Sequence, residues 1–402
     1  MIKKVYLAAT LAFLLSKSAF ANSSDSAFKK KKLRKTDIEI LYSHYLQDGN
    51  NSAVTGGRGT EKLSVYAPSV SLYSSGNNLN WKLKAGSDII TSASTDNIDF
   101  VQSSASRRDA RTYANLASSK NISKNTVAEL GTGFSMESDY LSLPISASFN
   151  GQSKNKMRSW ILESKCYFDD LRWGRLNSNY RRPVRLIYPS ELRNQEWFNT
   201  YKRQSFNLKF GLSQVVNKRN VIGVYPMLTW QQGLLSTPFH RVVFNNNETR
   251  VENLPDQRLK LAITNKWNVF IKGNLVLKNT LDVYSDNFGI NALGIESELA
   301  VKLKSGWTLS PFARYYSQTA SKYFAPYAIH SPDEFFYCSD YDFSRFYSIK
   351  TGVEFKFSQL YQLRNKLNFQ GAALRYAYYF RSNFLFAHAI SLSLNLQHTQ
   401  KK

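Results

Sequence analysis

Cysteine, acidic residues and long apolar runs are all scarce in this chain. Only two of its 402 residues are cysteines, Cys166 and Cys338. This excludes a disulfide-rich scaffold and a multi-cysteine metal site, and leaves room for one bridge. After the first 21 residues there is no run of about 18 apolar residues, so the sequence excludes a helical membrane protein.

The scarcity of acidic residues leaves a large positive charge. There are 29 acidic residues against 53 lysines and arginines, and the formal net charge is +24. In a cytoplasmic protein this surplus would favour a nucleic-acid partner. Residues 1–21, however, have a basic start, an apolar stretch and the small-residue pattern Ala19-Phe20-Ala21, which is typical of a cleaved export signal. We therefore expect a signal peptide over 1–21, a basic tether over 22–35 and no nucleic-acid partner.

The exported part of the chain alternates apolar and polar residues from Thr36 onward. In one block Ile295, Leu299 and Val301 fall on one face, with Glu296 and Lys302 on the other. The blocks are about 9–14 residues long, close to the ~9–11 that a tilted membrane strand needs and longer than the ~5–6 of a typical soluble strand. The aromatic content of 14% suits the interfacial girdles of a membrane barrel, although an aromatic-rich sandwich would show it too.

This pattern predicts an all-β fold: a closed antiparallel transmembrane β-barrel over residues 36–398, with about 16 strands and with fourteen or eighteen as the alternatives. The predicted strands cover 36–47, 60–74, 79–91, 108–119, 124–137, 139–150, 157–168, 204–216, 219–231, 258–270, 274–285, 289–303, 306–317, 345–357, 367–380 and 384–397. Pro68 and Gly371 are predicted bulges.

The connections between these strands alternate in length. Tight turns at 76–78, 217–219, 272–274 and 304–306 contrast with long segments at 169–203, 232–257 and 318–344. Outer-membrane barrels have short periplasmic turns and long extracellular loops. We therefore expect a location in the cell outer membrane, with both ends of the barrel in the periplasm. The expected partners are outer-membrane lipid, lipopolysaccharide and the barrel-assembly machinery.

Four segments carry a family resemblance. They are 48–63, which contains Gly56-Gly57-Arg58-Gly59, and 104–111, 137–140 and 233–239. Together they resemble the uncharacterised bacterial outer-membrane family catalogued as domain of unknown function 3570. The resemblance implies an envelope β-barrel of no established activity. Members of such families tend to be encoded near flavin-transferase and thioredoxin-like proteins, which implies a periplasmic redox partner.

No cofactor is expected. A flavin-transfer acceptor would need an acidic residue three positions before Thr55-Gly56, and Ser52 stands there instead. A glycine-rich turn is the ordinary explanation of this segment.

The polar face of the strands after residue 203 is rich in basic residues. Ten fall on that face, namely Lys209, Arg258, Lys260, Lys266, Lys278, Lys302, Arg314, Lys350, Lys356 and Arg375, and all but Arg258 are our candidates for lining the lumen. Four acidic residues share the face: Asp282, Glu296, Glu298 and Glu354. A basic lining favours anions in a water-filled lumen. The alternative is that these charges pair with one another and with inward-folded loops in a closed wall.

Enzymatic activity is not expected. No serine lies in a Gly-x-Ser-x-Gly elbow, and no glycine loop has the lysine and the helix of a phosphate-binding loop. The five histidines, His44, His240, His330, His388 and His398, lack metal-ligand spacing and are expected at the surface or the rim. Cys166 and Cys338 either form a bridge that ties the 318–344 loop to the rim or remain unpaired.

The function expected from the sequence is therefore a pore or a binding protein for small anionic solutes, or the outer-membrane component of an envelope redox system. The alternative class is a secreted soluble β-protein that binds acidic polysaccharide.

Overall fold

The computed structural model describes residues 33–76, 79–92, 108–137, 140–171, 201–364 and 366–401. Its contacts divide the chain into Met1–Leu33 with Lys401–Lys402, and Arg34–Gln400. The expected signal peptide over 1–21 lies outside the described residues, as does most of the tether. In the described part, none of the helices has both the length and the apolar character needed to cross a membrane.

Sixteen long strands make up the larger unit. They are β1 Leu33–Asp48, β2 Leu63–Ser75, β3 Asn80–Ser92, β4 Arg108–Asn121, β5 Thr126–Met136, β6 Leu141–Gln152, β7 Arg158–Asp170, β8 Lys202–Val215, β9 Asn220–Gly233, β12 Gln257–Lys272, β13 Leu275–Asp286, β14 Asn291–Lys302, β15 Trp307–Gln318, β16 Phe346–Phe357, β18 Leu367–Arg381 and β19 Leu385–Lys401.

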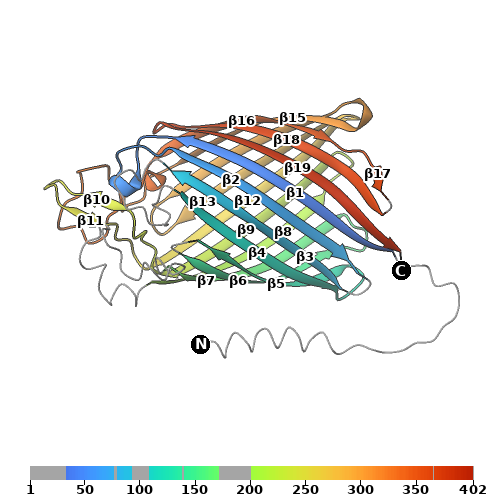
Figure 1. Ribbon diagram of the computed structural model, residues 1–402, viewed down its shortest axis with the longest axis horizontal. Helices are drawn as coiled ribbons and strands as arrows, with labels where there is room; N and C mark the ends of the chain where they lie inside the picture. The colour runs from blue at the N-terminus through green and yellow to red at the C-terminus, as the bar shows by residue number, and fades with distance from the viewer. Residues whose placement is uncertain are drawn as a thin grey trace. The chain divides into compact units, whose positions relative to one another are not determined.

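Each strand pairs with the next along the chain, and the sheet closes on itself. β9 pairs with β12, β16 with β18, and β19 with β1, so neither side of the sheet is left as a free edge. The result is the antiparallel barrel seen in Figure 1. Closure matters because an unpaired N–H or C=O in hydrocarbon costs several kcal/mol, and a closed sheet satisfies all of them.

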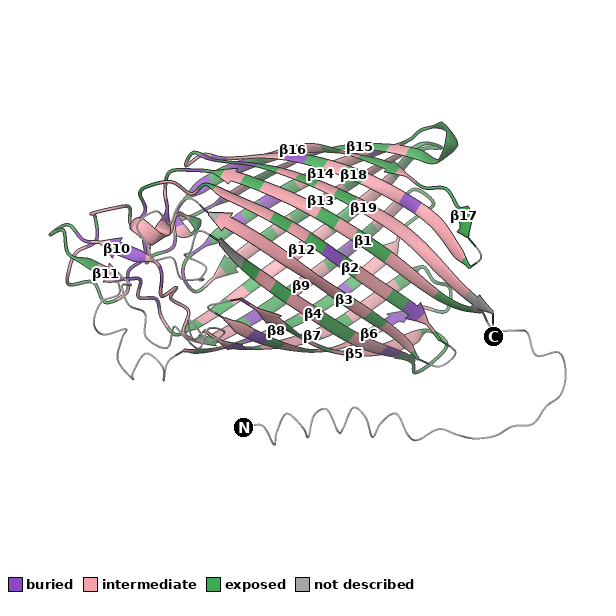
Figure 2. Cartoon of the chain, in the orientation of Figure 1, coloured by how far each residue is buried: buried purple, intermediate pink, exposed green. Residues whose placement is uncertain are grey.

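The outer face of this barrel is apolar. Along β14, Leu293 and Ile295 are exposed while Ala292 and Ala300 are buried. Figure 2 shows exposed residues alternating with residues of intermediate burial along the strands. The apolar faces therefore point away from the lumen, unlike the packed centre of a soluble sandwich, and the soluble polysaccharide-binding alternative is wrong for this fold.

All sixteen predicted strands are present, with ends shifted by a few residues. β4 pairs with β3 from Arg108 to Ser119 and with β5 from Thr112 to Asn121. The predicted bulge at Gly371 is confirmed by a register shift between Phe369 and Gly371. The predicted bulge at Pro68 is wrong, because the register between β2 and β3 is the same on both sides of that residue. Pro68 lacks an N–H, so it interrupts the pairing between β2 and β3 but does not shift the register.

The two ends of the barrel differ. Tight connections such as those around Lys218 and Gly273 gather at the end where β1 begins and β19 finishes, which we call the turn end. The segments 234–256 and 319–345 lie at the opposite end, which we call the loop end. There β10 Arg241–Val243 pairs with β11 Thr249–Val251, and both lie beyond the left-hand end of the strands in Figure 1. The remaining short elements are η1 Ala53–Thr55, η4 Lys304–Gly306, η5 Tyr341–Phe343 and β17 Tyr361–Arg364.

A charge introduced on the outer face should destabilise the barrel, because that face meets lipid. Ile295 is 48% exposed and lies between Leu281 and Tyr315 in the register. We expect Ile295→Arg to lower the free energy of unfolding in lipid vesicles by about 2–4 kcal/mol, as measured by urea titration. Thr280→Lys is the matched control, since Thr280 lies on the inner face between Glu296 and Lys266. Attraction to the first and repulsion from the second offset each other, so this variant should lose less than about 1 kcal/mol. Equal losses would contradict the assignment of faces.

Candidate functional site

Three loop-end segments pack against one another. They are 49–62, 234–256 and 319–345, and we call them together the cap. Isolated bridges join Phe244 to His330 and Asn253 to Tyr337. Val242, Phe244 and Tyr337 form one small apolar cluster, and Leu254, Phe288 and Cys338 form another. Figure 2 shows buried residues in these loops.

The glycine-rich segment of the cap forms a tight turn. η1 ends at Gly56, and Gly56, Gly57 and Gly59 all have positive φ. A Cβ on Gly57 would lie 3.0 Å from the carbonyl oxygen of Ser339, so glycine lets this segment approach the 319–345 loop. The hydroxyl of Thr55 donates to the carbonyl of Arg58 within the same turn. The segment is therefore a structural turn that joins two loops.

The cap also contains a buried polar cluster. The Cys338 thiol donates to Glu252 Oε1 at 2.9 Å, and the backbone N–H of Thr237 donates to Glu252 Oε2 at 2.7 Å. His240 Nδ1 lies 3.5 Å from Glu252 Oε1 and 3.7 Å from Asp340 Oδ2. This nitrogen makes no well-aligned hydrogen bond, so charge attraction holds it. The cluster joins the two longest described loops.

Burial and charge set the protonation of this cluster. Burial disfavours the charged imidazole, but the neighbouring carboxylates of Glu252 and Asp340 outweigh burial and raise the pKa of His240 to about 9. Burial, only partly offset by His240, raises the pKa of Asp340 to about 6. Burial, followed by the charges of Glu252 and Asp340, raises the pKa of the Cys338 thiol well above its ordinary value.

The described interior of the barrel contains two large cavities. The main cavity, of about 1360 Å³, is lined by residues of β1–β9, β12, β18 and β19 that include Lys82, Glu129, Lys165 and Lys260. The cap cavity, of about 810 Å³, lies between the cap and the wall formed by β1, β15, β16, β18 and β19. It is lined by Arg314, Lys350, Tyr379 and Arg381 of the wall and by Asp340 of the cap, among others.

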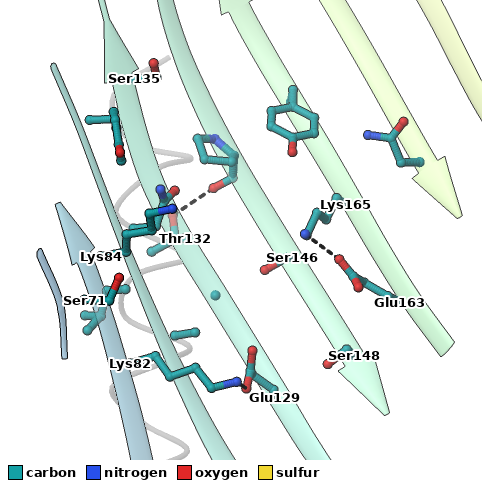
Figure 3. Close-up of a pocket in the computed structure, with 18 of the residues that line it drawn as sticks. Ser71, Lys82, Lys84, Glu129, Thr132, Ser135, Ser146, Ser148, Glu163 and Lys165 are labelled. Atoms are coloured by element: carbon teal, nitrogen blue, oxygen red, sulfur yellow. Dashed lines mark hydrogen bonds and ion pairs between the residues drawn. The ribbon is translucent and has the colours of Figure 1, made fainter. Parts of the chain in front are cut away.

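Many charges in the main cavity are paired. Figure 3 shows Lys82 reaching Glu129 and Lys165 reaching Glu163, with N–O distances of 2.7 and 2.5 Å. Arg203 pairs with Asp169 at 2.8 Å. These strands lie outside the region where the sequence indicated a basic lining. Their acidic residues make this half of the lumen more nearly neutral.

The nine candidate lumen residues divide by whether they have a carboxylate partner. Three are paired: Lys278 with Glu298, Arg314 with Asp282, and Arg375 with both Glu298 and Glu354. Within the described residues the other six form no ion pair, and they are Lys209, Lys260, Lys266, Lys302, Lys350 and Lys356. Lys209 and Lys266 both lie near the ring of Tyr225. Arg258, the tenth basic residue of the polar face, pairs with Asp286.

The two cysteines are free, so the bridge left open by the sequence is not formed. Cys166 is half-buried on β7, in phase with the exposed Leu162 and Phe168 of the outer face, whereas Cys338 is fully buried in the cap.

A further correction concerns His330, expected at the surface. It is 1% exposed, with Nε2 at 3.0 Å from the carbonyl of Cys338. In the described part of the chain no cluster of His, Cys, Asp or Glu is arranged to hold a metal ion.

A family model matches most of the chain. The model describes a protein of unknown function, DUF3570, and covers residues 4–385. The chain belongs to the DUF3570 family. The resemblance drawn from the segment 48–63 and its companions is thereby confirmed. No curated protein matches this DUF3570 chain.

Several solved outer-membrane proteins are similar to this DUF3570 chain. The protein OpdK from Pseudomonas aeruginosa is 9% identical over 90% of this chain and 99% of its own, with a TM-score of 0.43. A BenF-like porin from Pseudomonas fluorescens Pf-5 is 8% identical over 91% and 99%, also with a TM-score of 0.43. A bacterial polysaccharide outer membrane secretin is 10% identical over 90% and 98%, with a TM-score of 0.44. The fold assignment depends on the strand pairing itself, and these weak similarities add no functional argument.

The cap should loosen in alkaline solution. The pKa of His240 is about 9 in the folded chain against an ordinary value of 6.5, so its stabilising charge is fully present below pH 6.5 and lost as the pH rises through 9. We expect hydrogen-exchange protection of 234–256 and 319–345, corrected for intrinsic rates, to fall between pH 7.5 and 9.5. His240→Gln should give low protection at both pH values, and the control His388→Gln on the outer wall should behave like the parent. Protection that does not change with pH would contradict this account.

The thiol of Cys338 should be unreactive toward maleimide while the cap is folded. In a Cys166→Ser background, we expect a charged maleimide to label Cys338 only after denaturation, because the thiol is buried and its pKa is raised. Glu252→Ala removes the acceptor of the thiol and should speed labelling at least tenfold. Glu248→Ala, at an exposed residue of the β10–β11 connection, is the matched control and should leave the rate unchanged. Rapid labelling of the parent would show that the cap does not shield this residue.

Proposed function

We propose that this DUF3570 chain is an outer-membrane barrel whose lumen passes or binds small anionic solutes. The turn end faces the periplasm and the cap faces outward, as the contrast in connection length indicates. The chain performs no covalent chemistry in this account. The lumen acts through its size and its charge.

The main support is the set of lumen cations without carboxylate partners. Six of the nine candidates form no ion pair in the described chain, and they come from β8, β12, β14 and β16. Unpaired lysines in a water-filled passage attract anions and raise the barrier for cations. The main cavity of about 1360 Å³ provides room for hydrated solutes next to Lys260.

Lys350 is the cation best placed to meet a solute. It lies opposite Arg314 in the register of β15 and β16, and both line the cap cavity. Like charges directly opposite each other destabilise a sheet. Arg314 forms an ion pair with Asp282 at 3.3 Å. Lys350 forms no ion pair in the described chain, and only the charge of Glu296 offsets those of Arg314 and Arg375 around it. A carboxylate or phosphate entering the cap cavity would supply the missing charge.

The redox role implied by the family resemblance gains no support from a described residue. Thr55, the position considered for flavin attachment, is held within the tight turn of the cap. Solute passage or binding is therefore the single function that we propose.

Conductance in planar bilayers tests this proposal. We expect channels that prefer chloride over potassium in a salt gradient. The double variant Lys260→Gln/Lys350→Gln should lower the anion-to-cation permeability ratio several-fold, because it removes two unpaired lumen charges. Lys322→Gln/Arg345→Gln, at two exposed cap residues, is the charge-matched control and should keep the ratio. Silent bilayers from folded protein, or a preference for cations, would overturn the proposal.

A further inference from the structure

The turn end of the barrel has a charge pattern that solute passage does not require. Six of the turns there contain residues 120–125, 152–158, 216–220, 271–274, 302–306 and 356–364 with Lys366, which we call the basic rim. The rim contains thirteen lysines and arginines: Lys120, Lys124, Lys154, Lys156, Arg158, Lys218, Arg219, Lys272, Lys302, Lys304, Lys356, Arg364 and Lys366. All thirteen are exposed, and the same segments contain no aspartate or glutamate.

The loop end is different. The described parts of the cap contain Glu61, Glu248, Glu252, Asp256, Asp333, Glu334, Asp340 and Asp342 together with their basic residues. Acids and bases neutralise each other there, as Arg250 and Glu248 do at 2.8 Å. No such neutralisation is available within the rim. Among the residues that the structure describes, charge is therefore polarised along the barrel axis, with uncompensated cations at the turn end.

Exposed apolar side chains accompany the rim cations. Ile122 is next but one to Lys124, Val216 is next but one to Lys218, and Leu303 is adjacent to Lys304. Exposed Met157 and Leu363 occupy similar positions beside Lys156 and Arg364. Their exposed fractions reach 61% at Ile122 and 58% at Leu363. A surface of alternating cations and apolar groups fits a membrane interface, where lysine stems lie along acyl chains and the ammonium groups reach the phosphates.

We propose that the basic rim binds the anionic phospholipid head groups of the leaflet at the turn end. The distribution of the rim favours lipid over a docked protein, because the six turns lie between successive strand pairs from β4–β5 to β16–β18 and surround most of the barrel. A globular partner would contact one sector, whereas a leaflet contacts all of them. The rim shares only Lys302 and Lys356 with the lumen candidates, and the four lysines changed in the test below are not among those candidates, so the inference is tested independently of conductance.

Lipid competition around the intact barrel tests this inference. The folded full-length chain is placed in vesicles of zwitterionic phosphatidylethanolamine with increasing fractions of brominated phosphatidylglycerol, which quenches tryptophans such as the exposed Trp307 and Trp267 of the outer face. We expect quenching that shows phosphatidylglycerol enriched several-fold at the barrel in 50 mM salt, and an enrichment that falls steeply toward 500 mM salt, since exposed charges are screened.

Charge-matched variants locate the binding. Lys124→Gln/Lys156→Gln/Lys218→Gln/Lys304→Gln removes four rim charges and should abolish most of the enrichment. Lys62→Gln/Lys202→Gln/Lys322→Gln/Arg345→Gln removes four exposed charges from the loop end and should keep it. Heat-modifiable gel mobility confirms that each variant is folded. Equal enrichment in all three proteins, or equal loss in both variants, would overturn the proposal. Rim-dependent binding of polyglutamate without any lipid preference would instead assign the rim to an acidic protein.

Discussion

The need to pair every backbone polar group in hydrocarbon controls this structure. β19 pairs with β1 because an open sheet edge within the hydrocarbon would leave a row of N–H and C=O groups without partners. Once the sheet is closed, the two faces of each strand acquire opposite surroundings. The outer face must be apolar, and the inner face is free to hold charges such as those of Lys278 and Glu298. The division between lipid-facing and lumen-facing residues therefore follows from closure.

This constraint explains why the strands could be predicted from the sequence. A lipid-facing position tolerates few charges, so the alternation along β14 and β16 is nearly unbroken and marks the length of each strand. The prediction of a bulge at Pro68 is wrong because a proline in a strand has the same sequence signal whether it only removes one N–H or also shifts the register. Only the pairing of β2 with its neighbours separates them.

The cap and the ion pairs could not be predicted in the same way. Cys338 and Glu252 are 86 positions apart, in segments that show no periodicity, and no sequence signal brings them together. The strand phase places Arg375 on the inner face, but its contact with Glu298 on a strand that is not its neighbour depends on side-chain reach across the lumen. The length of the two loops and the glycines at 56, 57 and 59 were the only indications that the loop end has structure of its own.

The position of the cap also has a consequence for how the molecule assembles. β1 and β19 are paired although nearly the whole chain separates them, so this pairing closes the largest loop in the protein. Long-range pairings of this kind form slowly, because the entropy of closing the loop is lost before the contacts form. If strands insert from the turn end, the segments that form the cap must cross the hydrocarbon before Glu252, His240 and Asp340 can find one another. The buried cluster is then a product of completed insertion, and a barrel arrested halfway would lack it.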